Sequence, residues 1–259
     1  VLALNALPND LSKTFASGDR VLSLMEEEPE VYENDKGKKI NLNYIGIKNL
    51  DFQYSKGIKI LNNVNLSVKT SEIIGIKGAS GNGKSTLLKL IMRFWDKTSG
   101  KILLDNTEIK DVNTQSLKEN VTLISQSTYL FAGTIKENIK IAKLNASDKE
   151  LITACKKANI HDLIMSLENG YDSQIGEKNS GLSSGEAQRI GLARAFLRDA
   201  KLILLDEPTG NVDCINEGII LKSIIENAKD KAVIIVSHRN SSLSIANKVY
   251  TMKNGSLYE

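Results

Sequence analysis

The chain has 259 residues, of which 41% are hydrophobic and 25% are charged. These proportions are those of an ordinary globular protein, so the chain can bury a core and wholesale disorder is excluded. The 34 basic and 31 acidic residues are spread along the chain and give a formal net charge of +3. So small a surplus provides no basic face for nucleic acid, and we expect no nucleic-acid partner.

Cysteine usage and hydropathy restrict the chain further. Cys155 and Cys214 are far apart in the sequence and match no metal-ligand spacing, so we expect two reduced, cytosolic thiols. No run approaches the 18 or more consecutive apolar residues of a membrane-spanning helix, and no signal-peptide pattern is present. The first residue is Val rather than Met, which hints at a domain taken from a longer polypeptide.

The N-terminal segment differs in character from the rest. Residues 1–25 carry apolar side chains at helical spacing, and Pro8 and Gly18 interrupt the pattern, so we predict two short helices. Pro29 and the polar residues 34–39 then indicate a linker. We therefore divide the chain into a segment 1–38 and a compact domain 39–259.

Within the compact domain, short apolar runs alternate with helical patterns. Four runs are typical of strands buried on both faces of a parallel sheet: 73–76, 121–124, 202–205 and 232–236. Helices are predicted between them, at 85–94, 150–158, 187–197 and 216–228. This alternation predicts an α/β architecture with right-handed crossovers. Residues 139–182 lack a strong buried strand, so we predict an inserted α-helical subdomain over about 127–188.

The sharpest local signal is a glycine-rich segment that matches G-x4-G-K-[ST] between a predicted strand and a predicted helix. Its curled backbone would point successive N–H groups at an anion, and the helix N-terminus would add its positive dipole end. Lys84 would reach the β- and γ-phosphates of a nucleotide, and Ser85 would offer an oxygen to Mg²⁺. A chance glycine-rich turn is the alternative, and the strand–loop–helix context disfavours it. The predicted phosphate site comprises Gly78, Ala79, Ser80, Gly81, Asn82, Gly83, Lys84, Ser85 and Thr86.

Two adjacent carboxylates, Asp206 and Glu207, follow the predicted strand 202–205. In open α/β sheets, ligands bind at the carboxyl ends of the strands. We expect Asp206 to hold Mg²⁺ directly or through water, and Glu207 to orient and deprotonate the attacking water. An acidic turn that merely ends a strand is the alternative, and the upstream phosphate loop favours the catalytic interpretation.

The segment LSSGE at 182–186 resembles the signature motif of the ABC ATPase family, which usually reads LSGGQ; here Ser184 and Glu186 replace Gly and Gln. The resemblance implies a P-loop NTPase (RecA-like) core with a small antiparallel β subdomain. It also implies that Ser183 and Gly185 touch the γ-phosphate of an ATP held by the opposite subunit of a dimer. From the residues alone, Ser183-x-x-Glu186 is equally a helix capping box, and the two roles are compatible.

The resemblance covers residues from about 42 to the C-terminus and implies four further roles. Tyr54 would stack on adenine, although a lone aromatic residue is more often part of a core. Gln126 would ligate Mg²⁺ and relay motion to a membrane partner. Asp213 would lie in a loop that crosses to the second subunit, and His238 would contact the γ-phosphate. His161 has no such context, and we interpret it as structural.

Several segments resemble exporter-type members of the family in particular: 93–100, 130–139 and 176–178. Residues 1–30 resemble the cytosolic end of a last transmembrane helix with its linker. The resemblance thus implies an ATP-hydrolysing motor domain that dimerises around two MgATP, with a transmembrane domain fused upstream. The domain would lie on the cytoplasmic face of the cell membrane. The sequence of these segments resembles the branch of bacterial thiol or amino-acid exporters.

Three other readings are less consistent with the sequence. A soluble ABC ATPase acting on the ribosome or DNA would carry a second motor domain, coiled coils or basic arms. A non-hydrolysing regulatory protein would be expected to have lost Glu207 or His238, and both are present. The separate ATPase subunit of an importer would leave the first 30 residues unexplained.

Overall fold

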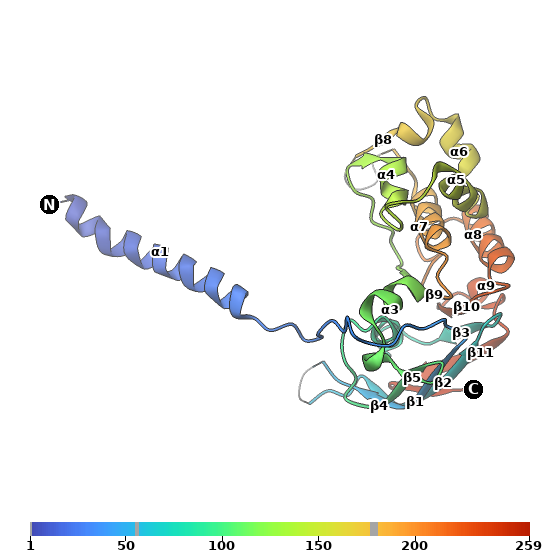
Figure 1. The fold of residues 1–259 in the computed structure, drawn as a ribbon, viewed down its shortest axis with the longest axis horizontal. Helices are drawn as coiled ribbons and strands as arrows, with labels where there is room; N and C mark the ends of the chain where they lie inside the picture. Colours follow the sequence, from blue (N-terminus) through green and yellow to red (C-terminus); the bar gives the residue numbers. More distant parts are fainter. Residues whose placement is uncertain (1, 55–56, 177–180) are drawn as a thin grey trace. The chain divides into compact units, whose positions relative to one another are not determined.

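The computed structural model describes residues 2–54, 57–176 and 181–259, with side chains from residue 11 onward. It divides into two units, one ending at Tyr32 and one spanning Glu33–Glu259 (Figure 1). The proposed exporter-like segment 176–178 is covered only in part, because Glu177 and Lys178 lie outside the described residues.

The first unit is built on a single helix, α1 (Leu2–Glu26), so the prediction of two short helices was wrong. A proline removes one intrahelical hydrogen bond and a glycine costs about 1 kcal/mol relative to alanine, and neither is obliged to end a helix. No helix in the described part of the chain is both long and apolar enough to span a bilayer. The helix nonetheless exposes large apolar side chains: Leu11, Phe15, Val21, Leu22, Leu24 and Met25.

The second unit begins at Glu33. Within it, polar residues of the predicted linker hydrogen-bond to the segment 111–114. The backbone N–H of Asn34 donates to the hydroxyl of Thr114 at 2.7 Å. The N–H of Lys38 donates to the carbonyl of Asp111 at 2.9 Å. These tertiary contacts are invisible in a polar composition.

Two sheets form the core of this unit. A four-stranded antiparallel sheet has the order β2-β1-β4-β5. A six-stranded sheet has the order β12-β11-β3-β10-β9-β6, in which all neighbours are parallel except β11 and β12. The four strands predicted from apolar runs lie side by side in it as β3, β10, β9 and β6, which confirms the α/β class. The strands are β1 (Tyr44–Phe52), β2 (Leu61–Lys69), β3 (Ile73–Lys77), β4 (Ser99–Leu104), β5 (Thr107–Glu108), β6 (Val121–Ile124), β9 (Leu202–Asp206), β10 (Ala232–Val236), β11 (Lys248–Lys253) and β12 (Ser256–Tyr258).

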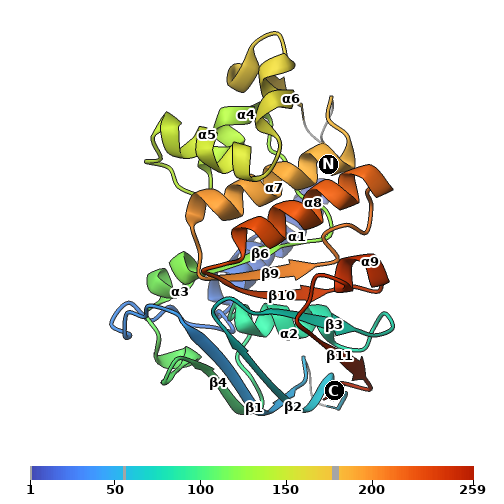
Figure 2. The ribbon, with the colours of Figure 1, turned by 90° about the vertical axis from the view of Figure 1, so that its right-hand side faces the viewer.

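The larger sheet is covered on both faces, which explains its uninterrupted apolar strands. Alternate residues of β9 enter different clusters: Ile203 and Leu205 pack with α7 (Ser184–Arg198) and α8 (Cys214–Asn227), whereas Leu202 and Leu204 pack with α2 (Lys84–Ile91) and the antiparallel sheet. Figure 2 shows this layering, with α7 and α8 above β9 and β10 and with α2 below them.

The predicted helical insertion lies between β6 and β9. It contains α4 (Ile135–Lys140), α5 (Asp148–Lys157), α6 (His161–Ser166) and the start of α7, together with the two-residue strands β7 (Gly133–Thr134) and β8 (Gln174–Ile175). Helices α4, α5 and α7 each begin at a reciprocal capping box, in which a Ser or Thr and a Glu three residues later satisfy each other's backbone N–H groups. The remaining elements of this unit are α3 (Thr114–Asn120), α9 (Asn240–Leu243) and the 3-10 turns Ile109–Asp111 and Gly170–Asp172.

Candidate functional site

The glycine-rich loop connects β3 to α2, as its sequence context predicts. Gly81 and Gly83 have φ values of +81° and +96°, a region that favours glycine. At Gly78, a Cβ atom would lie 2.3 Å from the backbone oxygen of Met252. The side-chain amide of Asn82 donates to that same oxygen at 3.2 Å. Strand β11 therefore supports the loop from behind, a contact that the motif by itself does not reveal.

Lys84 is the first residue of α2, and its side chain is buried inside the loop. Its ammonium group donates to the carbonyls of Gly78 at 2.8 Å and Ala79 at 2.9 Å. The cation is thus held at the N-terminal end of the helix, where the dipole also favours an anion. The charge of Lys84 and the positive dipole end of α2 therefore lie close together, which suits a polyphosphate.

A cavity of about 300 Å³ opens beside the loop. It joins elements that are distant in sequence: the loop itself, the end of β9, the segment after β6, and residues around β1 and β2. Most of the predicted nucleotide-site residues line it, together with Ile60, which carried no signal in the sequence. The lining residues are Tyr54, Ile60, Ser80, Gly81, Gly83, Lys84, Ser85, Thr86, Gln126, Asp206 and Glu207.

Tyr54 forms one wall of this cavity and is 46% exposed. Its hydroxyl lies 3.1 Å from that of Thr86, and its ring packs edge-on against Phe52 and Trp95. These contacts fix the ring beside the phosphate loop while leaving part of it accessible to a planar ligand.

The two carboxylates differ in their surroundings. Asp206 ends β9, where burial and the charge of Glu207 raise the pKa of its carboxyl, against a hydrogen bond with Ser85 and the charge of Lys84. Glu207 has a φ of +49°, an unfavourable value for a side chain with a Cβ. Its Oε2 lies 3.1 Å from Nδ1 of His238. Glu207 lines the cavity and so connects it to His238, which is not itself among the lining residues.

We expect Asp206→Asn to stabilise the chain at neutral pH, by up to about 1 kcal/mol because solvent at this half-buried carboxylate screens the penalty. Burial raises the pKa of Asp206 above the unfolded value of about 3.9. The folded state therefore binds this proton more tightly than the unfolded chain, and stability is lost as the pH rises through the folded pKa. Asparagine does not ionise and so avoids that loss. Urea unfolding without nucleotide, at pH 7 and near pH 4, measures the difference in unfolding free energy between Asp206→Asn and the wild type. A difference that did not shrink on acidification would contradict the explanation.

Ser183, Gly185 and Asp213 lie elsewhere, at the N-termini of two helices, and none of them lines the described cavity. Ser183 caps α7: the N–H of Glu186 donates to its hydroxyl at 3.3 Å. Gly185 packs so closely on α8 that a Cβ would lie 2.6 Å from Cγ of Asn216. Asp213 caps α8 by accepting from the N–H groups of residues 215 and 216, and hydrogen bonds from Asn216 lower the pKa of its carboxyl. Within one chain, these residues are therefore apart from the phosphate loop.

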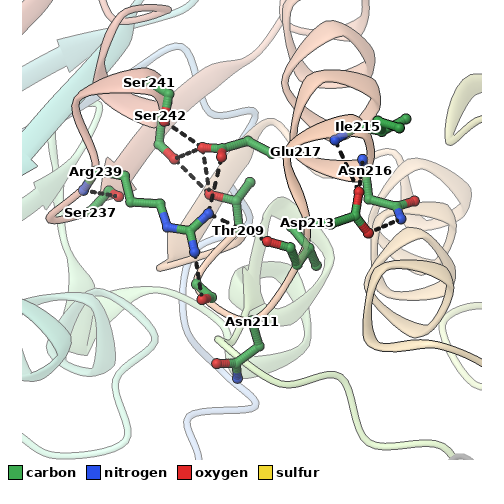
Figure 3. A network of polar contacts seen from close by, with 12 residues as sticks. Thr209, Asn211, Asp213, Ile215, Asn216, Glu217, Ser237, Arg239, Ser241 and Ser242 are labelled. Atoms are coloured by element: carbon green, nitrogen blue, oxygen red, sulfur yellow. Dashed lines mark hydrogen bonds and ion pairs between the residues drawn. The ribbon is translucent and has the colours of Figure 1, made fainter.

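A buried polar network that the sequence analysis did not identify lies between Ser237 and Asp213 (Figure 3). It is centred on the ion pair of Glu217 and Arg239, whose Oε2 and Nη1 atoms are 3.0 Å apart. The only sequence signal would have been an acidic residue in the first turn of a predicted helix, which is commonplace.

A second hollow, of about 390 Å³, is apolar in character and lies between the end of α2, β6, α4 and α7. Its rim carries exposed large apolar side chains: Phe94, Tyr129, Phe131 and Ile141. Neither the phosphate loop nor the two carboxylates contribute to it.

Comparisons with known proteins agree with this arrangement. The profile of the family described as ABC transporter matches residues 61–210. An ABC transporter ATP-binding/permease protein of Haemophilus influenzae is 48% identical over 256 residues, which cover 98% of this chain and 46% of that protein. A Bacillus subtilis ATP-binding/permease protein, whose name refers to multidrug export, is 41% identical over 96% of this chain and 43% of its own length.

The fold has a close counterpart among solved structures. A bacterial Atm1-family ABC exporter with ATP bound superimposes with a TM-score of 0.87 at 30% identity, over 96% of this chain and 44% of that one. The chain thus spans somewhat less than half of the relatives that it matches. The family match over more than half of the chain, the identities and the shared fold lead to one conclusion: the chain belongs to the ABC transporter family and is an ATPase domain of that family.

Proposed function

We propose that the cavity beside the glycine-rich loop binds ATP and hydrolyses its terminal phosphate bond. The observation that carries the proposal is the meeting of the loop, its buried Lys84 and the Asp206–Glu207 pair in one cavity. Backbone N–H groups and Lys84 would hold the phosphates, and the exposed part of the Tyr54 ring would stack on the base.

The chemistry of the donor set fits Mg²⁺. Ser85, Gln126 and Asp206 offer hydroxyl, amide and carboxylate oxygens around the same cavity, and hard oxygen ligands are what Mg²⁺ binds. These three residues would hold the ion. When bound, Mg²⁺ neutralises charge on the β- and γ-phosphates.

Glu207 would act as the general base toward the attacking water. His238 would orient the Glu207 carboxylate and contact the γ-phosphate. Their 3.1 Å contact supports this pairing, since a base must itself be held in place to accept a proton efficiently. Ser183, Gly185 and Asp213 would complete the site of a second copy or of a homologous partner. Their position at two helix N-termini, away from their own chain's cavity, supports that role.

Isothermal titration calorimetry with MgATP tests the binding part of this proposal, and phosphate release tests hydrolysis. We expect saturable MgATP binding that weakens when EDTA removes Mg²⁺, followed by slow turnover. The absence of heat with MgATP at any accessible concentration would contradict the proposal, whereas binding without phosphate release would contradict hydrolysis alone.

We further propose that the whole protein is a membrane exporter, with this domain on the cytoplasmic face and a transmembrane domain fused upstream. The relatives named above are ATP-binding/permease proteins more than twice as long as the matching segment. The apolar hollow rimmed by Phe94, Tyr129 and Phe131 offers a docking place for a permease segment. The exposed apolar side chains of α1 suit the end of a transmembrane helix.

The sequence encoded upstream of residue 1 tests the fusion. Apolar spans of about 20 residues are expected there, and their absence would favour a separate ATPase subunit. No observation favours a soluble ATPase acting on the ribosome or DNA. The thiol or amino-acid branch stays a prediction.

A further inference from the structure

The first turn of α8 lies between two loops that carry predicted nucleotide-site residues. Two adjacent residues of this turn, Asn216 and Glu217, point to opposite sides of the helix (Figure 3). Asn216 hydrogen-bonds to Asp213 at 2.6 Å and accepts a hydrogen bond from Arg189 of α7. Glu217 faces the loop that follows β10, where His238 lies.

Glu217 is only 7% exposed, yet both of its carboxylate oxygens have partners. Oε1 accepts from the hydroxyls of Ser241 at 2.6 Å, Ser242 at 3.2 Å and Thr209 at 3.2 Å. Oε2 pairs with Arg239 at 3.0 Å. Burial alone would raise the pKa of Glu217, but the hydrogen bond from Ser241 and the pairing with Arg239 lower it overall. The residue is therefore a buried, ionised and fully bonded carboxylate.

Arg239 connects this carboxylate to two backbone segments. Its guanidinium also donates to the carbonyls of Gly210 at 3.0 Å and Val212 at 3.5 Å, in the loop that leads to Asp213. The backbone N–H of Arg239 donates to the hydroxyl of Ser237 at 3.0 Å. His238 is the residue between Ser237 and Arg239. Arg239 therefore holds the loop 210–213 through its guanidinium and contacts Ser237, on the other side of the histidine, through its backbone N–H.

We infer that Glu217 is a positioning residue for ATP hydrolysis: with Arg239, it sets His238 against Glu207 and holds the loop 210–213 in register with them. The inference rests on the proposed function and adds a part that no motif of the sequence contains. Glu217 lines no part of the nucleotide cavity, so it acts through other residues. A rigid, directional carboxylate–guanidinium pair suits this task better than an apolar contact, which fixes no orientation.

The inference predicts that a substitution at Glu217 lowers kcat while KM for ATP stays nearly unchanged. Glu217→Gln keeps the size of the side chain but removes the charge that Arg239 requires. The phosphate loop and Tyr54 remain untouched, so KM for ATP should stay within about threefold. Misplacement of a reacting group by about 1 Å can cost 10²-fold in rate, so we expect kcat to fall about tenfold from a smaller shift.

A double-mutant cycle identifies the pair as the unit that acts. Arg239→Gln should also lower kcat, and the double variant should be no slower than the slower single variant, because the interaction is lost only once. Fully additive losses would mean that the two residues act separately, which would overturn the inference. Arg239→Lys keeps the charge but cannot reach both carbonyls and the carboxylate, so it should show an intermediate kcat; it also serves if Glu217→Gln does not fold.

Asp199→Asn is the matched control. Asp199 pairs at 2.5 Å with Lys231, a cation that is only 3% exposed and lies at the opposite end of β10 from His238. This change should lower Tm without lowering kcat, with all rates measured well below every Tm. Unchanged kcat in Glu217→Gln, or an equal loss in Asp199→Asn, would overturn the positioning role. A wild-type chain that fails to bind MgATP would instead refute the proposed function itself.

Discussion

Replacing Glu207 by Gln is expected to lower ATP turnover about 10²–10⁴-fold, the usual contribution of a general base, while MgATP binding persists. The amide has nearly the shape of the carboxylate but cannot accept the proton of the attacking water. The left-handed backbone at residue 207, with φ of +49°, already holds the side chain beside His238. The substitution therefore removes a proton acceptor and leaves the phosphate-binding groups unchanged.

Phosphate release and calorimetry on the same preparation measure the two quantities separately. Glu226→Gln makes the same chemical change on the exposed surface of α8 and should leave turnover within about twofold, as surface substitutions usually do. Turnover equal to that of the wild type would refute the role of Glu207 as base.

The same variant also tests the dimer, because unhydrolysed ATP should hold two chains together. We expect size-exclusion chromatography of Glu207→Gln to show a dimer with MgATP and a monomer without it. The γ-phosphate would join the phosphate loop of one chain to the signature helix of the other, and slow hydrolysis would leave that contact in place. A monomer that persists at high ATP would contradict the shared site while leaving nucleotide binding intact.

Lys84→Ala should act on binding itself and weaken MgATP affinity about 10–150-fold. A hydrogen bond from a charged group contributes about 1.5–3 kcal/mol, which converts to that range. The ammonium of Lys84 lies inside the curled loop, 2.8 Å from the carbonyl of Gly78, and so already occupies the position from which phosphate oxygens would be reached. No other described lysine lines this cavity to replace it.

Calorimetry measures this loss, and Lys77→Ala supplies the control. Lys77 ends β3 directly before the loop and is exposed, so its removal changes the local net charge equally without touching the cavity. We expect its affinity to change less than about twofold. If both variants weakened binding alike, general electrostatic attraction would explain the effect and the specific role of Lys84 would be refuted.

The sequence by itself determined the parts of this protein that are local in the chain. The four apolar runs predicted adjacent strands of one parallel sheet, because a strand buried on both faces has to be apolar throughout. The glycine-rich segment predicted a strand–loop–helix turn, because its backbone needs residues that tolerate positive φ. The apolar run 202–205 was also enough to indicate that Asp206 and Glu207 stand at the carboxyl end of a strand, as they do at the end of β9.

Tertiary structure decided what depends on groups that meet across long distances. Composition indicated a linker at residues 34–39, yet Asn34 and Lys38 of this stretch hydrogen-bond to the segment 111–114 of the compact unit. The support of Gly78 by Met252, and the placement of Ile60 in the cavity wall, have no local signature. The pairing of Glu217 with Arg239 also has no local signature. A buried charge is stable only beside a suitable partner, and the fold brings these two residues together from separate segments of the chain.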